Sequence, residues 1–169
     1  IYDEPGIDDR NIAILPLSDD DWLVCFNTYT SDQISRTMTL KTADGGQTWS
    51  KPRAVCDLDA RTRSAPVKLS TGRLILPFYR APGDQSLAAL SDDGGESWEI
   101  AEIANAPGFI GDEWDVCELP DGRLVGIIRN NVRGSDGKYD GTFYKTESRD
   151  GGRTWSQVKK TNLFSARNT

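Results

Sequence analysis

Several charged residues, arginines together with carboxylates, stand beside short apolar segments of this chain rather than inside them. Arg10 precedes the segment NIAILPL, and Arg63 lies just before APVKL. Asp112 and Glu113 lead into WDVCEL, and Arg129 follows RLVGII. A guanidinium pairs with a carboxylate through two parallel hydrogen bonds. If the apolar segments bring these residues to one place, they form a site for a small acidic ligand.

The composition argues against several other kinds of site. The 169 residues carry a formal net charge of −6, which argues against a nucleic-acid partner, because contacts to phosphates draw on a basic surface. No apolar run approaches the ~20 residues that span a bilayer. The chain has no histidine, and its three cysteines lack CxxC spacing, so neither a zinc site of the usual kind nor a histidine-dependent triad is expected.

One phrase occurs three times, as TADGGQTWS at 42–50, SDDGGESWE at 91–99 and SRDGGRTWS at 148–156. The central aspartates are Asp44, Asp93 and Asp150, which are 49 and 57 residues apart. A second and weaker phrase recurs in step with the first, and its leucines fall at 23, 74 and 124. The chain is therefore built from three units of about fifty residues.

Each unit contains four short apolar segments separated by turns, which predicts a four-stranded antiparallel meander. Four-stranded units repeated around an axis form a β-propeller. We therefore predict an all-β partial propeller over 1–169, with blades at approximately 8–56, 57–107 and 108–169. A β-sandwich is the alternative, but it does not require an in-register repeat. In a meander the first and third turns share one end, so the charged residues named above should gather at the other end.

The repeated phrase is expected to be structural. Adjacent glycines permit positive φ, the aspartate can accept hydrogen bonds from backbone N–H groups, and the tryptophan offers a large apolar surface. This set comprises Asp44, Trp49, Asp93, Trp98, Asp150 and Trp155. Cys25 and Cys117 lie inside apolar segments and are expected to be buried.

The repeated phrase is similar to the Asp-box, or bacterial neuraminidase repeat, and the chain resembles roughly the N-terminal half of the six-bladed sialidase superfamily. The stretch EWDVCELPDGRLVGIIR, 113–129, also resembles a sialidase phrase in which a glutamate opens a strand and an arginine follows sixteen residues later. This resemblance implies that Glu113 pairs with a tyrosine nucleophile and that Arg129 clamps the substrate carboxylate. A looser match suggests Arg10 as another clamp arginine and Asp32 as the acid/base.

The chemistry that the resemblance implies is that of a retaining exo-sialidase with a tyrosine nucleophile. The glutamate accepts the phenol proton, and the aspartate protonates the leaving oxygen and then activates water. No metal or cofactor is needed, and the expected ligand is a glycan or a small acidic sugar. None of the five tyrosines matches the context of the nucleophile, which belongs to later blades.

Three blades do not close a propeller. The chain is therefore expected to be a piece of a longer protein, to pair with a second copy, or to receive its missing half from another chain. Cleavage of terminal sialic acid is the leading function. The alternatives are another exo-glycosidase of the same fold, such as an exo-arabinanase-like enzyme, and a non-catalytic carbohydrate-binding propeller. Family habit favours a secreted or periplasmic location.

Overall fold

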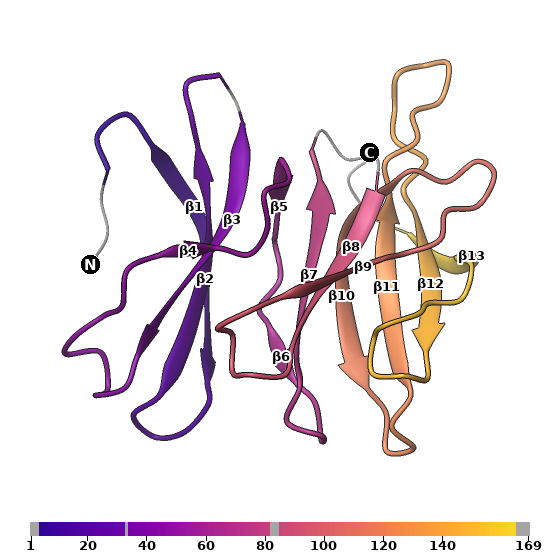
Figure 1. Ribbon diagram of the computed structural model, residues 1–169. Helices are drawn as coiled ribbons and strands as arrows, with labels where there is room; N and C mark the ends of the chain where they lie inside the picture. The colour runs from indigo at the N-terminus through magenta and orange to yellow at the C-terminus, as the bar shows by residue number, and fades with distance from the viewer. Residues whose placement is uncertain (1–3, 33, 82–84, 165–169) are drawn as a thin grey trace.

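The computed structural model describes residues 4–32, 34–81 and 85–164, which form three antiparallel sheets side by side (Figure 1). The first sheet contains β1 (Asp8–Pro16), β2 (Trp22–Tyr29), β3 (Ser35–Thr42) and β4 (Arg53–Ala54). The second contains β5 (Ala60–Arg61), β6 (Val67–Lys68), β7 (Leu74–Arg80), β8 (Gln85–Ser91) and β9 (Glu99–Glu102). The third contains β10 (Gly111–Glu118), β11 (Leu124–Asn130), β12 (Thr142–Ser148) and β13 (Lys159–Phe164). No helix in these ranges could cross a membrane, and the prediction of an all-β chain is confirmed.

The first strand of the second sheet is divided. The segment APVKL was expected to form one strand, but only Val67 and Lys68 pair with β7, and β5 pairs with β7 further along. Pro66 has no N–H group to donate to the ladder. The Thr62 hydroxyl instead donates to the carbonyl of Pro77, at 2.7 Å. The backbone at 62–66 is therefore free to leave the plane of the sheet.

The first strands of the other two sheets are bulged at the corresponding level. In the first sheet Arg10 pairs with Asn27, but the next pair is Ala13 with Cys25. In the third sheet Gly111 pairs with Asn130, but the next pair is Trp114 with Ile128. A bulge bends its strand and changes the direction of its side chains, and bulges are common next to functional sites. All three first strands therefore redirect side chains at the same end of the molecule.

Two apolar cores hold the three sheets together. Leu76, Phe78 and Leu87 lie in the core shared by the first and second sheets, where burial raises the pKa of Cys25 to about 12. Between the second and third sheets, Trp114 lies in a separate core and packs edge to face against Trp155, with ring centroids 5.3 Å apart. Alternate residues along each strand point into these cores.

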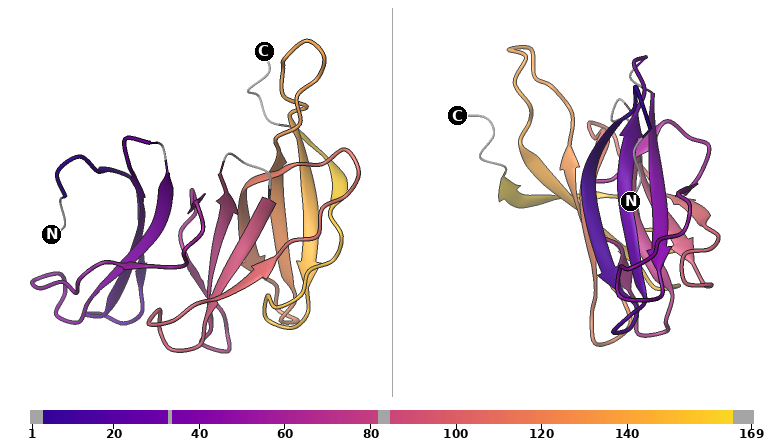
Figure 2. Two further views of the ribbon diagram at one scale, coloured as in Figure 1. Left: turned by 45° about the horizontal axis from the view of Figure 1, so that its top comes forward. Right: turned by 90° about the vertical axis from the view of Figure 1, so that its left-hand side faces the viewer.

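The first and third sheets lie at the two ends of the row (Figure 2), and each has a face that no other sheet covers within the described residues. On the first sheet, Ile12 and Ile14 are 71% and 51% exposed beside a hollow of about 350 Å³. On the third sheet, Cys117 is exposed, so the expectation that it is buried was wrong. The reason is that alternation places Cys117 on the uncovered face.

The repeated phrases form three turns with the same hydrogen bonds. In the first, Thr42 donates to Asp44 at 2.7 Å, the Thr48 backbone N–H donates to Asp44 at 2.8 Å, and Gly46 N donates to the Thr42 hydroxyl at 2.9 Å. The copies centred on Asp93 and Asp150 repeat this arrangement. We call the end of the molecule that carries these turns the box end.

The boxes also join neighbouring sheets, which the sequence did not indicate. The second glycine of each of the later boxes has φ close to +90°, and a Cβ at Gly95 would lie 3.0 Å from Leu23 of the preceding sheet. At Gly152 a Cβ would lie 2.9 Å from Leu90 and 3.1 Å from Ile75. Each of these glycines is therefore required both for its backbone conformation and for close packing between sheets.

Candidate functional site

The bulge in β10 places two consecutive carboxylates beside one arginine. Arg129 Nη1 lies 2.8 Å from Glu113, and its Nε donates to Asp112 at 3.1 Å, with Nη2 also bonded to Asp112. Asp112 is only 2% exposed, whereas Glu113 is half-buried. Burial lowers the pKa of Arg129, but the hydrogen bond and charge of Asp112 outweigh it and leave the pKa raised. The buried aspartate thus fixes the guanidinium, while the glutamate stays accessible.

Arg63 extends the cluster from the second sheet. It leaves the strand within the break between β5 and β6, and its Nε lies 3.0 Å from Glu113. It also shares a hydrogen bond with the Tyr79 hydroxyl. The Glu113 carboxylate is therefore held between two guanidinium groups from different sheets. We call Arg63, Asp112, Glu113 and Arg129 the Glu113 cluster, and the end of the molecule that carries it the arginine end.

Tyr79 stands beside this cluster as a neutral phenol. Burial raises its pKa, and the charges of Asp112 and Glu113 raise it further, against the opposing effect of the hydrogen bond with Arg63. A raised pKa makes a phenol harder to deprotonate and therefore a weaker nucleophile. Tyr79 is thus suited to orienting Arg63 rather than to attacking a substrate.

Arg10 lies at the same end but is not bonded to the Glu113 cluster. Its side chain is exposed and forms an ion pair with Asp8, and its guanidinium carbon lies 4.7 Å from the ring centroid of Tyr29. Arg61 of the second sheet lies over the same ring, at 5.2 Å. Tyr29 therefore connects the arginines of the first and second sheets through cation–π contacts.

Asp32 lies in the exposed turn between β2 and β3. Among the residues that the structure describes, no hydrogen bond or ion pair links Asp32 to the Glu113 cluster. Its placement agrees with the end of the molecule expected from the sequence, since the β2–β3 turn is opposite the boxes. Its chemical role stays a prediction.

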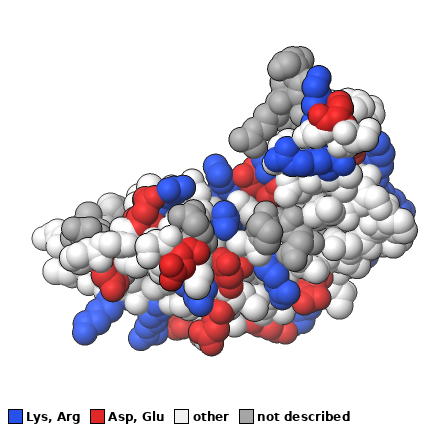
Figure 3. Space-filling view, turned by 90° about the horizontal axis from the view of Figure 1, so that it is seen from above, with Lys and Arg blue, Asp and Glu red and all other residues white. Residues whose placement is uncertain are grey.

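The sequence did not indicate that the connection between β11 and β12 lies beside the Glu113 cluster. Residues 131–141, which we call the arm, rise beyond the end of the third sheet (Figure 1). Tyr139 of the arm lies with its ring centroid 5.8 Å from the guanidinium carbon of Arg129. The signal was present only as an unusually long, glycine-rich interval between two apolar segments. Viewed from above, this end of the molecule shows intermingled acidic and basic side chains (Figure 3).

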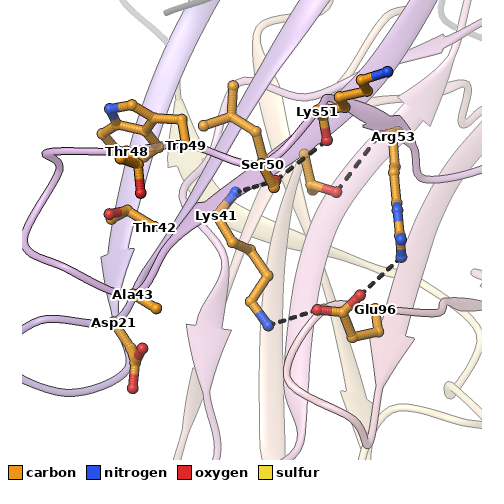
Figure 4. Close-up of a pocket in the computed structure, with 13 residues that line it drawn as sticks. Asp21, Lys41, Thr42, Ala43, Thr48, Trp49, Ser50, Lys51, Arg53 and Glu96 are labelled. Carbon is orange, nitrogen blue, oxygen red and sulfur yellow. Dashed lines mark hydrogen bonds and ion pairs between the residues drawn. The ribbon is translucent and has the colours of Figure 1, made fainter.

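The opposite end holds a different kind of polar cluster. A hollow of about 510 Å³ lies between the first sheet and the second box, where Glu96 contacts Lys41 at 2.9 Å and Arg53 at 2.8 Å (Figure 4). These pairs join two neighbouring sheets, so they belong to the packing between sheets. No group of three or more potential metal ligands occurs within residues 4–32, 34–81 and 85–164.

The sheets and the boxes together define a class of protein, the sialidase-type β-propeller. The BNR repeat-like domain family matches residues 12–169, and the chain belongs to this family. The curated anhydrosialidase of Macrobdella decora is 33% identical over 87 residues, which are 52% of this chain and 10% of that protein. This match thus spans a small part of the relative's length.

Solved structures share the fold. A protein of unknown function from Dyadobacter fermentans superposes with a TM-score of 0.80 at 20% identity, over 97% of this chain and 54% of that one. The intramolecular trans-sialidase of Ruminococcus gnavus gives a TM-score of 0.60 at 24% identity, over 77% of this chain and 27% of that one. The prediction of a partial sialidase-type propeller is confirmed.

Proposed function

We propose that the complete protein is an exo-glycoside hydrolase that removes terminal sialic acid from glycans. The observation that carries this proposal is the Glu113 cluster, in which one carboxylate is held between Arg63 and Arg129. Two guanidinium groups aimed at one position are suited to binding a carboxylate ligand. Membership of the BNR repeat-like family and similarity to an anhydrosialidase support the same class of substrate.

In the proposed mechanism, Arg129 binds the carboxylate of the sugar and Asp112 keeps the guanidinium in place. Glu113 accepts the phenol proton of a tyrosine supplied from outside these three sheets, and the tyrosine oxygen attacks the anomeric carbon. Asp32 gives a proton to the departing oxygen and later takes one from the water that releases the sugar. Arg10 and Arg63 contribute positive charge to the ligand position.

Replacement of Arg129 tests the clamp. We expect Arg129→Ala in the complete protein to abolish binding of N-acetylneuraminate in a calorimetric titration. Because Ala leaves the buried Asp112 without its partner, Arg129→Lys is the second variant, which keeps the charge but loses the planar fork. Arg149→Ala, an exposed change in the third box, is the matched control. Unchanged affinity in both Arg129 variants contradicts the assignment. Binding without hydrolysis by the unmodified protein would favour the carbohydrate-binding alternative.

We also propose that further blades cover the two uncovered faces. The apolar hollow beside Ile12 and Ile14 supports this for the first sheet. In the first and second sheets, the box of the next sheet packs on Leu23 and on Ile75. Val125 holds the same place in the strand register of the third sheet, which supports a further box there. Light scattering of the 18.7 kDa chain distinguishes the sources: a dimer indicates closure by a second copy, and a monomer indicates blades from elsewhere.

A further inference from the structure

The arm is a small, well-bonded hairpin rather than an open loop. Gly134 N donates to the carbonyl of Lys138 at 2.8 Å, and Asp140 N donates to the carbonyl of Val132 at 2.9 Å. At its base, Asn130 donates to the Asp140 carboxylate at 2.9 Å. These bonds hold the arm in a defined position above the third sheet, so side chains on it are already ordered before a ligand arrives.

Arg133 is fixed on this arm beside the Glu113 cluster. Its guanidinium stacks on the Tyr139 ring at 4.0 Å from the centroid, and it donates to the Tyr139 hydroxyl at 2.5 Å and to the carbonyl of Gly137 at 2.9 Å. Arg129 lies by the same ring. Two guanidinium groups thus lie near one tyrosine ring, the inner one half-buried in the cluster and the outer one exposed.

The outer guanidinium is suited to contacting a ligand. A guanidinium has five N–H donors, and the two bonds described above leave donors for another acceptor. Its orientation is set by stacking and hydrogen bonds, so little side-chain entropy is lost when it binds. No carboxylate among the described residues forms an ion pair with Arg133. The two acidic groups of the arm, Asp136 and Asp140, are bonded to Lys138 N and Asn130.

We propose that Arg133 forms an outer subsite for a second acidic group, carried by the sugar next to the one that Arg129 binds. The preferred ligand is then a glycan with two adjacent acidic sugars, and a glycan whose acidic sugar is followed by neutral ones binds less well. This inference rests on the proposed function, because it takes Arg129 as the clamp for the terminal carboxylate. Tyr139 orients Arg133 by stacking and by its hydroxyl.

The test compares two ligands with the same terminal sugar. Thioglycoside forms of α2,8-linked disialic acid and of 3′-sialyllactose, which resist cleavage, are titrated into the complete protein by calorimetry. We expect disialic acid to bind roughly fivefold more tightly, the upper range for an exposed ion pair, and the difference to shrink as salt is added. Arg133→Gln should remove the difference without changing the affinity for sialyllactose.

Lys138→Gln is the matched control. It removes the same charge from the same arm, but the hydrogen bonds described for Lys138 use its backbone rather than its side chain. It should leave the preference for disialic acid in place. Equal affinity of the unmodified protein for the two ligands overturns the outer subsite, and so does an equal loss for both ligands in Arg133→Gln. If the unmodified protein binds neither ligand, the proposed function fails and the subsite fails with it.

Discussion

The box end and the arginine end of this molecule are built from the same three sheets but follow opposite rules. At the box end, three turns repeat one set of hydrogen bonds around Asp44, Asp93 and Asp150. At the arginine end, each first strand is bulged or divided at the same level, yet the residues there differ from sheet to sheet.

The difference follows from what each end contacts. Each box after the first packs on the preceding sheet, so the same problem recurs and the same residues solve it. The arginine end presents side chains from all three sheets to one shared space, where arginines and carboxylates of different sheets contact one another and no single residue type suits every position. Residues that repeat from sheet to sheet therefore pack the sheets together, whereas residues that differ from sheet to sheet are the ones available to a ligand. We therefore expect substitutions at the box end to change stability and substitutions at the arginine end to change activity.

The largest expected effect is on catalysis at the arginine end. Glu113→Gln keeps the shape of the side chain and one of the two oxygens that accept from Arg63 and Arg129, but removes the negative charge and the proposed base. We expect kcat of the complete protein to fall about 10²- to 10⁴-fold, with a change in unfolding free energy below about 1 kcal/mol. Steady-state kinetics and urea unfolding measure the two quantities. A loss of stability that matches the loss of activity would contradict the separation of the two ends.

The next largest effect is on stability at the box end. Gly152→Ala adds a Cβ that would meet Leu90 and Ile75 at positive φ, and should cost about 2–4 kcal/mol through overpacking and backbone strain. Gly122→Ala is the matched control, because its φ is also positive but nothing lies within 4 Å of the added carbon. Urea unfolding should show a clearly smaller loss for Gly122→Ala. Equal losses of unfolding free energy in the two variants would mean that backbone strain alone accounts for the effect and that packing of the box against the neighbouring sheet contributes nothing.

A smaller effect concerns acid stability. Hydrogen bonds from Thr48 and Thr42 lower the pKa of Asp44 from 3.8 to about 2. Since the unfolded chain then binds the proton more readily, the stability from this group is complete above about pH 4 and is lost as the pH falls through about 2. Asp44→Asn should therefore flatten the melting temperature between pH 4 and 2, relative to the unmodified chain. An unaltered slope would refute the contribution of the box.

The smallest effect is expected for the ion pairs between boxes. Glu96 is exposed while it contacts Lys41 and Arg53 of the first sheet. Because exposed ion pairs are screened by water and salt, Glu96→Gln should lower the unfolding free energy by less than about 1 kcal/mol. A loss as large as that of Gly152→Ala would show that charge, rather than close packing at the glycines, holds the sheets together.

Much of the fold was predictable because its signals are local. A box is a nine-residue turn whose repeated hydrogen bonds around the aspartate run among its own residues, so its pattern is visible in the sequence. The uncovered face was not predictable in the same way, and Cys117 shows why. Its segment is apolar, but whether a strand face is covered depends on which sheet lies next to it.

The site was predictable in part. The meander predicted that Glu113 and Arg129 lie at the same end of the molecule, and in the structure they are 2.8 Å apart. The sequence did not indicate that Asp112 and Glu113 would both lie beside Arg129, because a bulge depends on how two strands align. It also missed the arm, since Arg133 meets Tyr139 only when the chain folds back on itself.

The sequence by itself determined the repeat, the four-stranded units and the end at which charged residues gather. Those features depend on contacts within a few residues and on the alternation of a strand. Only the tertiary structure decided which carboxylate is buried, which arginines share Glu113 and which sheet faces are open. Those features depend on the level at which the first strands bulge and on the packing of one sheet against the next, which no short segment of the sequence records.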